Sequence, residues 1–329
     1  MNRALLMTSL SLLTALLFAA SLLTGPAGLG IAAGTEGLFA GGSEAASVIL
    51  REIRLPRALL GLATGFALGL SGAALQGFLR NPLAEPGLIG ISGLASLGAV
   101  LIFYSGLAGS SLYALPAGAL AGAALAVLIL LAIARASGST LTLILAGVAL
   151  SSLAGALTSL VLNLSANPFA AYEIIFWLLG SLKDRSLVHA AIALPLIGLG
   201  SVLLFATARA LDALSLGEES AASLGVSVPR TRILIVTGVA LSVGATAAIA
   251  GSIGFIGLVV PHLIRPLTSR LPGSLLLPSA LGGASLLLAA DIAVRLVIPG
   301  RELNVGVFTA LIGAPFFLWL VMASRRETA

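Results

Sequence analysis

Long apolar runs separated by short polar breaks dominate the chain. A helix needs about 20 apolar residues to cross a bilayer, whereas a barrel strand shows only about 10 alternating residues. The continuous runs therefore predict an all-α polytopic membrane protein, a single transmembrane domain over residues 1–329. We expect about ten spanning helices, of which the eighth is short: 4–24, 58–79, 87–104, 112–134, 140–163, 187–208, 231–250, 252–265, 275–298 and 305–323.

One polar break between the sixth and seventh runs, residues 210–225, looks like a small folded element outside the membrane. Three carboxylates fall within eight residues: Asp212, Glu218 and Glu219. The pattern predicts two short helices, with Asp212 as a cap for the first and a Ser215–Glu218 capping box for the second. Gly225 would end the second helix, because glycine tolerates the left-handed conformation. A helix over about 216–224 is too short and too acidic to span a bilayer.

Composition supports a membrane location. The chain is 59% hydrophobic and 9% charged with a mean hydropathy of +1.15, whereas soluble domains are about 25% charged. There is no cysteine, which excludes disulfides and thiolate metal sites. The net charge of +5 is explained by basic residues in the loops, which set membrane topology and contact lipid head groups. We therefore expect no nucleic-acid partner. The first run is longer than the apolar core of a signal peptide and predicts the first transmembrane helix of a multi-pass protein.

The distribution of arginines gives a weak topology signal. With a cytoplasmic N-terminus, residues 210–225 and the C-terminal arginines lie inside, as the positive-inside rule favours. Arg51, Arg54 and Arg57 lie outside against that rule. Two interpretations stay open for this cluster: long side chains that snorkel to the interface, and a docking surface for an acidic partner.

Three other stretches carry polar chemistry. The segment Arg80–Pro86 has two prolines in one tight loop, which predicts either a plain connector or a gate at the mouth of a pathway. In the eighth run, the lone His262 is more typical of a structural residue than of a metal ligand, and no metal site is expected. Asp291 and Arg295 are four residues apart, which favours an ion pair over a proton relay.

Missing motifs narrow the function further. The chain has one lysine, Lys183, and no glycine-rich loop ending in Gly-Lys-Ser/Thr, so any ATP must bind to another chain. It also lacks the Gly-x-Ser-x-Gly and His-Glu-x-x-His motifs, which argues against an intramembrane enzyme. An ion-coupled secondary transporter would need carboxylates in several spans, and only Asp291 and, marginally, Glu173 qualify.

Eight stretches of the chain together carry a family resemblance. They are Ile53-Arg-Leu-Pro-Arg57, Gly72-Ala-Ala-Leu-Gln76, Arg80-Asn-Pro-Leu-Ala-Glu-Pro-Gly-Leu-Ile-Gly90, Leu145-Ala-Gly-Val-Ala-Leu150, Trp177 to Ser181, Leu216-Gly217 with Leu224-Gly225, Gly254-Phe-Ile-Gly-Leu-Val-Val-Pro-His262, and Glu302 to Ala314. From about residue 50 to 323 the sequence closely resembles the FecCD-type permeases, the membrane subunits of ABC importers for iron-siderophore chelates, haem and cobalamin.

The resemblance implies a ten-helix subunit that works as a homodimer, with two cytoplasmic ATPase subunits holding ATP and Mg and a periplasmic binding protein delivering the ligand. It implies no cofactor on this chain. The residues that match ATPase-coupling positions are Asp212, Leu214, Ser215, Leu216, Gly217, Glu218, Glu219, Leu224 and Gly225. Those that match binding-protein docking positions are Arg54, Arg57 and Arg295, and those at cytoplasmic gates are Asn81, Pro82, Leu83, Ser139, Thr140 and Leu141.

The resemblance also implies that spans five and ten line the pathway. We expect a small, apolar lining from residues such as Ala154, Ala156, Ser159 and Asn163. Such a lining suits a bulky ligand held loosely and does not choose among siderophore, haem and cobalamin. Because most family members serve iron, an iron chelate, siderophore or haem, is the favoured cargo, and cobalamin is the alternative.

Overall fold

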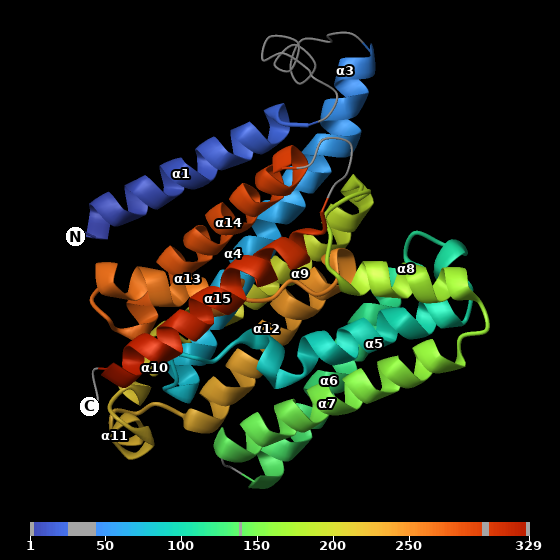
Figure 1. Ribbon diagram of the computed structural model, residues 1–329. Helices are drawn as coiled ribbons and strands as arrows, with labels where there is room; N and C mark the ends of the chain where they lie inside the picture. The colour runs from blue at the N-terminus through green and yellow to red at the C-terminus, as the bar shows by residue number, and fades with distance from the viewer. Residues whose placement is uncertain (1–2, 26–43, 138–139, 298–302, 327–329) are drawn as a thin grey trace.

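The computed structural model describes residues 3–25, 44–137, 140–297 and 303–326 (Figure 1). Within these ranges the chain is a bundle of helices of very unequal length. The α-helices are α1 (Arg3–Leu23), α3 (Glu44–Val48), α4 (Leu55–Leu79), α5 (Ile91–Tyr104), α6 (Ala114–Ser137), α7 (Thr140–Leu164), α8 (Pro168–Leu178), α9 (Leu187–Ala206), α10 (Ala208–Leu214), α11 (Glu218–Ser223), α12 (Val228–Ala250), α13 (Ile256–Ile264), α14 (Pro272–Val297) and α15 (Val305–Arg326). Short 3₁₀ turns lie at Pro86–Ile89, Leu107–Gly109 and Arg265–Leu267, and a π-helical turn, Ile49–Arg54, joins α3 to α4.

The predicted spans agree with the helices. Seven helices of the described chain are long and apolar enough to cross a membrane, and the predicted spans three, eight and ten correspond to the shorter apolar helices α5, α13 and α15. Helix α8 was not predicted. Its signal is Asn167-Pro168: the Asn167 side chain accepts the Phe169 N–H at 3.0 Å, and proline occupies the first turn.

Helix α4 is the centre of the bundle and packs closely along α14. Twenty of its residues are buried, many of them glycine, alanine or serine. A Cβ atom at Gly65 would overlap the carbonyl oxygen of Gly283 on α14, and one at Gly283 would overlap that of Gly65. Small residues on both helices therefore let the two backbones touch, which is how helices associate where lipid removes the hydrophobic drive.

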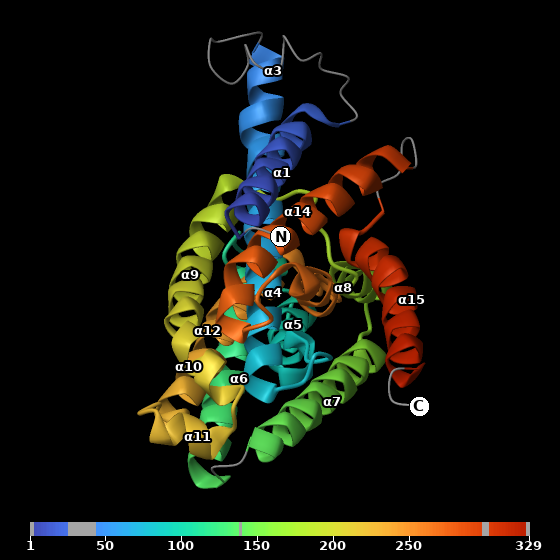
Figure 2. The same ribbon diagram turned by 90° about the vertical axis from the view of Figure 1, so that its left-hand side faces the viewer.

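The remaining helices surround this pair (Figure 2). Helix α1 packs against α14, α9 and α6 pack against α12, and α7 runs along α5. Figure 1 places the start of α1 and the end of α15 together with α10 and α11 on one side of the bundle, and α3 on the other. This arrangement matches the predicted topology, in which residues 210–225 share a side with both termini.

The eighth predicted span, 252–265, is only partly helical. Helix α12 ends at Gly251, with φ +70°, an irregular linker follows, and α13 begins after Phe255, with φ +69°. Non-helical backbone at this position leaves main-chain groups unpaired, which is tolerated in a membrane only where protein or a cavity surrounds it. The linker 251–255 is therefore the place to look for a pathway.

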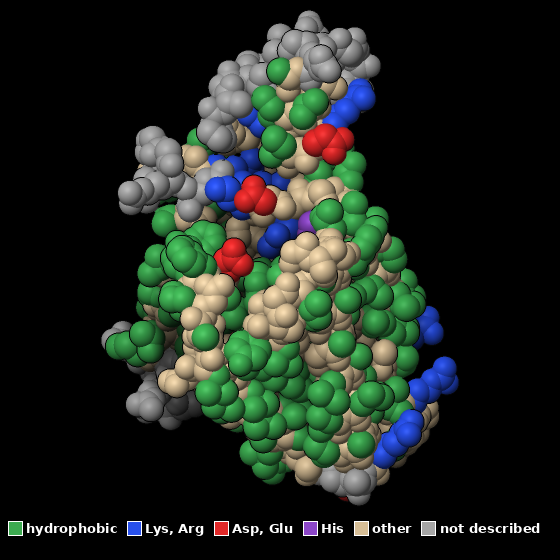
Figure 3. Space-filling model, turned by 90° about the vertical axis from the view of Figure 1, so that its right-hand side faces the viewer, with side chains coloured by type: hydrophobic (Ala, Val, Ile, Leu, Met, Phe, Trp, Pro, Cys, Tyr) green, Lys and Arg blue, Asp and Glu red, His purple; other side chains and the backbone are tan. Residues whose placement is uncertain are grey.

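The outer surface has the distribution expected of a membrane protein. Figure 3 shows a wide band of hydrophobic side chains, with charged side chains gathered at its upper end and further cations at its lower right. Large apolar side chains that are more than half exposed in the described chain include Leu128, Leu145 and Val202. An apolar face of this extent is stable only against lipid or another protein chain.

Candidate transport pathway, coupling element and outer basic cluster

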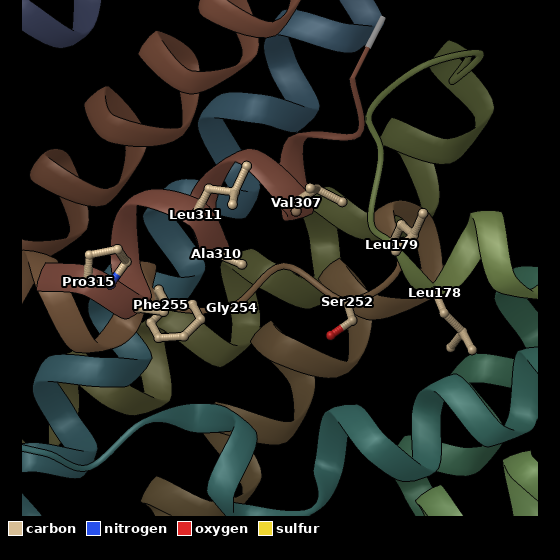
Figure 4. Close-up of a pocket in the computed structure, with 11 residues that line it drawn as sticks. Leu178, Leu179, Ser252, Gly254, Phe255, Val307, Ala310, Leu311 and Pro315 are labelled. Atoms are coloured by element: carbon tan, nitrogen blue, oxygen red, sulfur yellow. The ribbon is translucent and has the colours of Figure 1, made fainter. Parts of the chain in front are cut away.

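The irregular linker lines a cavity of about 590 Å³ (Figure 4). Three segments far apart in sequence form its wall: the end of α8, the linker and one face of α15. The lining residues are Leu178, Leu179, Ser252, Gly254, Phe255, Gly306, Val307, Ala310, Leu311, Ala314 and Pro315. Ser252 supplies the one polar side chain among them, so the cavity offers no charge and no strong metal ligand.

Main-chain hydrogen bonds hold together the outer end of this cavity, which we call the roof. Ser181 N–H donates to the Ala250 carbonyl at 2.8 Å, and Gly306 N–H donates to the Gly180 carbonyl at 3.0 Å. The Asn304 side chain adds a bond to the Phe176 carbonyl at 3.1 Å. These contacts tie α8, the end of α12 and the start of α15 into one unit.

The predicted pathway residues on α7 lie away from this cavity. Ala156, Ser159 and Asn163 are exposed on the outer face of α7, and Ser159 bonds back to the Gly155 carbonyl. Ala154 is 1% exposed and packs beside Gly93 of α5. Span ten, α15, does line the cavity. A role for the α7 residues in lining a pathway requires a second chain against α7 and stays a prediction.

The predicted gate loop after α4 is an ordered turn. Asn81 Oδ1 accepts the Leu83 N–H at 2.9 Å, and the Asn81 carbonyl accepts the Ala84 N–H at 3.1 Å. Asn81 and Pro82 are exposed and Leu83 is half-buried. In the second predicted gate, Ser139 lies outside the described residues, Thr140 begins α7, and Leu141 is exposed. The gating role of both segments stays a prediction.

A polar joint that sequence reasoning missed connects the gate loop to the cavity. Glu85 Oε1 accepts the Phe255 N–H at 2.5 Å, at the residue where α13 begins. Gln76 of α4 donates to the Ala84 and Gly257 carbonyls at 3.4 and 3.3 Å and accepts from Arg265 at 2.8 Å. The gate loop, α4 and α13 therefore share one hydrogen-bond network.

The electrostatics of Glu85 reflect its burial. Burial raises the pKa of the Glu85 carboxyl, and the hydrogen bond from Phe255 partly opposes that rise. A carboxylate here also faces the positive end of α13, which favours its charged form. Glu85 sits in the connection between α4 and α5, where its side chain spans the distance to the linker.

The acidic stretch forms the predicted pair of short helices, α10 and α11, and α10 is anchored to the membrane part. Asp212 Oδ1 accepts the Gly273 N–H at 2.7 Å, at the start of α14. Leu211, Leu214 and Ala221 are buried. Movement of α10 would thus be transmitted directly to α14, and through α14 to α4.

The predicted caps of this element were partly wrong. Asp212 lies inside α10 and caps no turn of its own element, and its carboxylate instead accepts an N–H in the first turn of α14. Ser215 Oγ donates to the Asp212 carbonyl at 2.6 Å, and α11 begins after Gly217 without a side-chain cap, so no capping box forms. Gly225 does have the predicted left-handed conformation, with φ +82°. The tight turn at Gly217, φ +107°, replaces the expected cap.

The predicted ATPase-coupling residues fall into an exposed group and a group that packs against the rest of the protein. Leu216 and Leu224 are 67% and 65% exposed, and Glu218 and Glu219 are exposed beside them. Two exposed leucines on an element outside the bilayer form an apolar contact surface with an acidic border. Asp212 and Leu214, in contrast, hold the element in place.

The three predicted docking arginines are more buried than an outer surface cluster implies. Arg54 is 4% exposed and Arg57 is 9% exposed. Arg54 donates to the Leu22 and Leu23 carbonyls at 3.0 and 2.9 Å, and Arg295 donates to those of Ser21 and Thr24 at 3.0 and 2.7 Å. Both arginines therefore satisfy the last carbonyls of α1, which an α-helix leaves without partners.

Asp291 sits between two of these arginines. Arg57 Nη2 and Arg295 Nη2 contact its two carboxylate oxygens at 2.9 Å each, and Arg57 Nε adds bonds of 3.0 and 3.2 Å. The predicted Asp291–Arg295 pair is confirmed, and Arg57 is a third member that sequence reasoning missed. The triad joins α4, α14 and the end of α1.

A pocket of about 360 Å³ opens beside the triad. Arg54, Arg57 and Arg295 line it together with Lys183 and Arg185, two cations not assigned a role from the sequence. Glu52 and Asp184 are the carboxylates at its wall, so positive charge predominates. Burial lowers the pKa of Arg185, and the Asp184 carboxylate opposes that effect.

Comparison with known proteins decides the family. The model of the FecCD transport family matches residues 13–323. The chain belongs to the FecCD family. It is accordingly a multi-pass inner-membrane permease of an ABC importer of the metal-chelate type, as its spans and its structural likeness also indicate.

Relatives in this FecCD family cover most of the chain. It is 43% identical over 281 residues to the Fe(3+) dicitrate transport permease FecD of Escherichia coli, covering 84% of this chain and 86% of the relative. It is 42% identical over 280 residues to the cobalamin import permease BtuC of Halobacterium salinarum, covering 84% and 74%. A solved structure of a metal-chelate type ABC transporter in an inward-facing conformation matches with a TM-score of 0.86 and 32% identity, covering 96% and 98%.

Proposed function

We propose that this FecCD permease forms, as a homodimer, the pathway that carries an iron chelate into the cytoplasm. Two separate ATPase subunits, which bind ATP and Mg, would drive it, and a periplasmic binding protein would deliver the cargo. The observation that carries the proposal is the cavity of about 590 Å³ between α8, the linker and α15, with its single polar side chain. A smooth apolar wall suits a large chelate that keeps its metal fully ligated.

The geometry of α10 and α11 supports the proposal that a separate ATPase drives transport. Its exposed leucines, Leu216 and Leu224, and its glutamates face away from the membrane part, whereas Asp212 bonds to the start of α14. A rigid-body push on α10 and α11 would therefore reach the tightly packed α4–α14 pair. At the opposite end, the pocket lined by Arg54, Arg57 and Arg295 would receive an acidic surface of the binding protein. These charges would set the orientation of the binding protein more than its affinity.

Iron chelates, siderophore or haem, are the favoured cargo, and cobalamin is the alternative. Relatives named for iron dicitrate and for cobalamin are 43% and 42% identical, so overall identity does not separate the two. The uncharged lining likewise offers no ligand that prefers one chelate.

Uptake into proteoliposomes tests the proposal. The permease, reconstituted with its ATPase and binding protein, is supplied in parallel with a radiolabelled ferric siderophore, haem and cobalamin. We expect uptake of one iron chelate that requires ATP and the binding protein. Uptake that continues without ATP but stops when a proton gradient is dissipated would refute the ABC importer, and ATP-driven uptake of cobalamin alone would favour the alternative.

A further inference from the structure

A second pocket on the coupling side, which we call the basic pocket, joins the gate loop to the coupling element. It has a volume of about 230 Å³ and ten lining residues. Three of the lining residues are arginines, and none carries a carboxylate. The lining residues are Ala73, Gln76, Gly77, Arg80, Pro82, Ser215, Arg265, Arg270, Pro272 and Leu275. Pro82 belongs to the predicted gate loop and Ser215 to the stretch between α10 and α11.

The positive charge of this pocket is not balanced within the described part of the chain. Salt bridges there involve Asp291 and its two arginines, and none involves Arg80, Arg265 or Arg270. Arg265 bonds to Gln76 through Nη2, while its buried Nε has no partner. The nearby carboxylate of Asp212 accepts the Gly273 N–H and forms no salt bridge with any of these three arginines. Three guanidinium groups around one small cavity therefore leave a site for an anion.

Two of the arginines occupy backbone conformations that few side chains adopt. Arg80, which caps the end of α4, has φ +49°, and Arg270, which precedes α14, has φ +64°. Such a conformation costs a residue other than glycine on the order of 1–3 kcal/mol and persists where the surroundings require it. Arginine at both positions, where glycine would be unstrained, indicates that the side chain has a use.

We propose that the basic pocket receives an acidic side chain of the ATPase subunit, as a second contact beside the coupling element. This inference rests on the proposed function. The planar fork of arginine matches a carboxylate in geometry and in charge. Ser215 in the wall makes the pocket continuous with the surface of exposed leucines and glutamates on α10 and α11.

A protein carboxylate fits better than a lipid phosphate. A phospholipid would need an apolar path for its acyl chains beside the head-group site. The two large or methyl-bearing apolar side chains in the wall, Leu275 and Ala73, are 2% and 0% exposed and offer no such path. The remaining lining is polar, proline or glycine, and it opens beside the element that lies outside the bilayer.

This contact would let the ATPase act on the gate directly. Arg80 immediately precedes Asn81 of the gate loop, and Arg265 bonds to Gln76, which also holds the Ala84 and Gly257 carbonyls. An acidic side chain that enters or leaves the pocket would thus shift the gate loop and α13 together. The exposed coupling helices would transmit force to α14 in parallel, through Asp212.

The test compares a pocket variant with a charge-matched control. Arg80→Gln/Arg270→Gln removes two charges from the pocket, and Arg3→Gln/Arg135→Gln removes two from exposed positions on α1 and α6. Each purified permease in neutral-lipid nanodiscs is titrated with its ATPase at several salt concentrations. We expect the pocket variant to bind about tenfold more weakly and with a flatter salt dependence, because charge pairs at an interface are screened by salt. The control should bind like wild type.

Three outcomes overturn the proposal, and they are distinguishable. Equal affinity and salt dependence in both variants would exclude the contact while leaving the importer intact. Failure of the wild-type permease to bind any ATPase would remove the proposed function, and this inference with it. The pocket would instead be assigned to a phosphate group if the ATPase affinity were the same in both proteins while wild type bound inorganic phosphate, or anionic lipid added to the nanodiscs, more tightly than the pocket variant. Thermal unfolding of both variants identifies any loss of folding.

Discussion

Asp291→Asn should destabilise the membrane bundle strongly, because it removes the negative charge that Asp291 supplies to two buried guanidinium groups. Asp291 is 1% exposed, and its side chain is contacted by Arg57 and Arg295 at 2.9 Å each. At an effective dielectric constant of about 20, each attraction is worth about 4 kcal/mol. The net loss is smaller, since the carboxylate's own desolvation cost disappears, and breaking a buried pair typically costs about 3–5 kcal/mol. We expect about 3 kcal/mol, because the asparagine oxygen still accepts one hydrogen bond.

Equilibrium unfolding of the purified permease in mixed detergent–SDS micelles measures this free energy. Asp184→Asn is the control, since it removes one carboxylate from an exposed outer position and should change stability by less than about 0.5 kcal/mol. Adding Arg57→Gln to Asp291→Asn should recover about 1–3 kcal/mol relative to the sum of the single changes, as expected for coupled neighbours. The reasoning fails if Asp291→Asn unfolds like the Asp184→Asn control, or if the two changes at the triad are additive.

Three further predictions address packing, coupling and passage. Gly283→Val places a branched side chain against the Gly65 carbonyl and should prevent tight α4–α14 packing, seen as aggregation on size-exclusion chromatography, whereas wild type stays monodisperse. Glu218→Lys/Glu219→Lys should leave the fold intact but uncouple ATP hydrolysis from uptake; normal transport by this variant would remove the acidic pair from the contact. Leu311→Trp should obstruct the cavity and reduce uptake about tenfold with ATPase activity retained, and undiminished uptake would mean that the cargo takes another route.

The spans and the element outside the membrane were predictable from local signals. Unbroken apolar runs located every helix that crosses or enters the bundle except α8, which is only eleven residues long. Its Asn167-Pro168 start was readable, but eleven residues fall below the length that a span requires. Gly225 ended α11 as predicted, because the preference of glycine for positive φ is a property of the residue itself.

The buried ion pairs and hydrogen bonds between helices were not predictable, since the residues that they join are distant in sequence. Arg57 lies 234 positions from Asp291, and Glu85 lies 170 positions from Phe255. The predicted topology put the outer arginines at a surface against the positive-inside rule, and only the packing of α1 against α14 reveals that Arg54 and Arg295 cap a helix end. The predicted capping box failed because the Ser215 hydroxyl bonds to the Asp212 carbonyl and α11 begins only at Glu218, after the turn at Gly217.

The roof of the cavity is held by main-chain hydrogen bonds, whereas the wall below it is made of side chains. Its closure depends on main-chain atoms of Gly180, Ser181, Ala250 and Gly306 and on one side-chain bond from Asn304, so the main-chain part persists in any sequence that keeps the two glycines. The walls below it are side chains of Val307, Ala310 and Leu311, on a helix already fixed at its start. On the proposed pathway, cargo preference would therefore change by exchanging wall residues one at a time while the main-chain contacts of the roof stay in place. Such modularity is a physical route by which one architecture serves chelates of different shape.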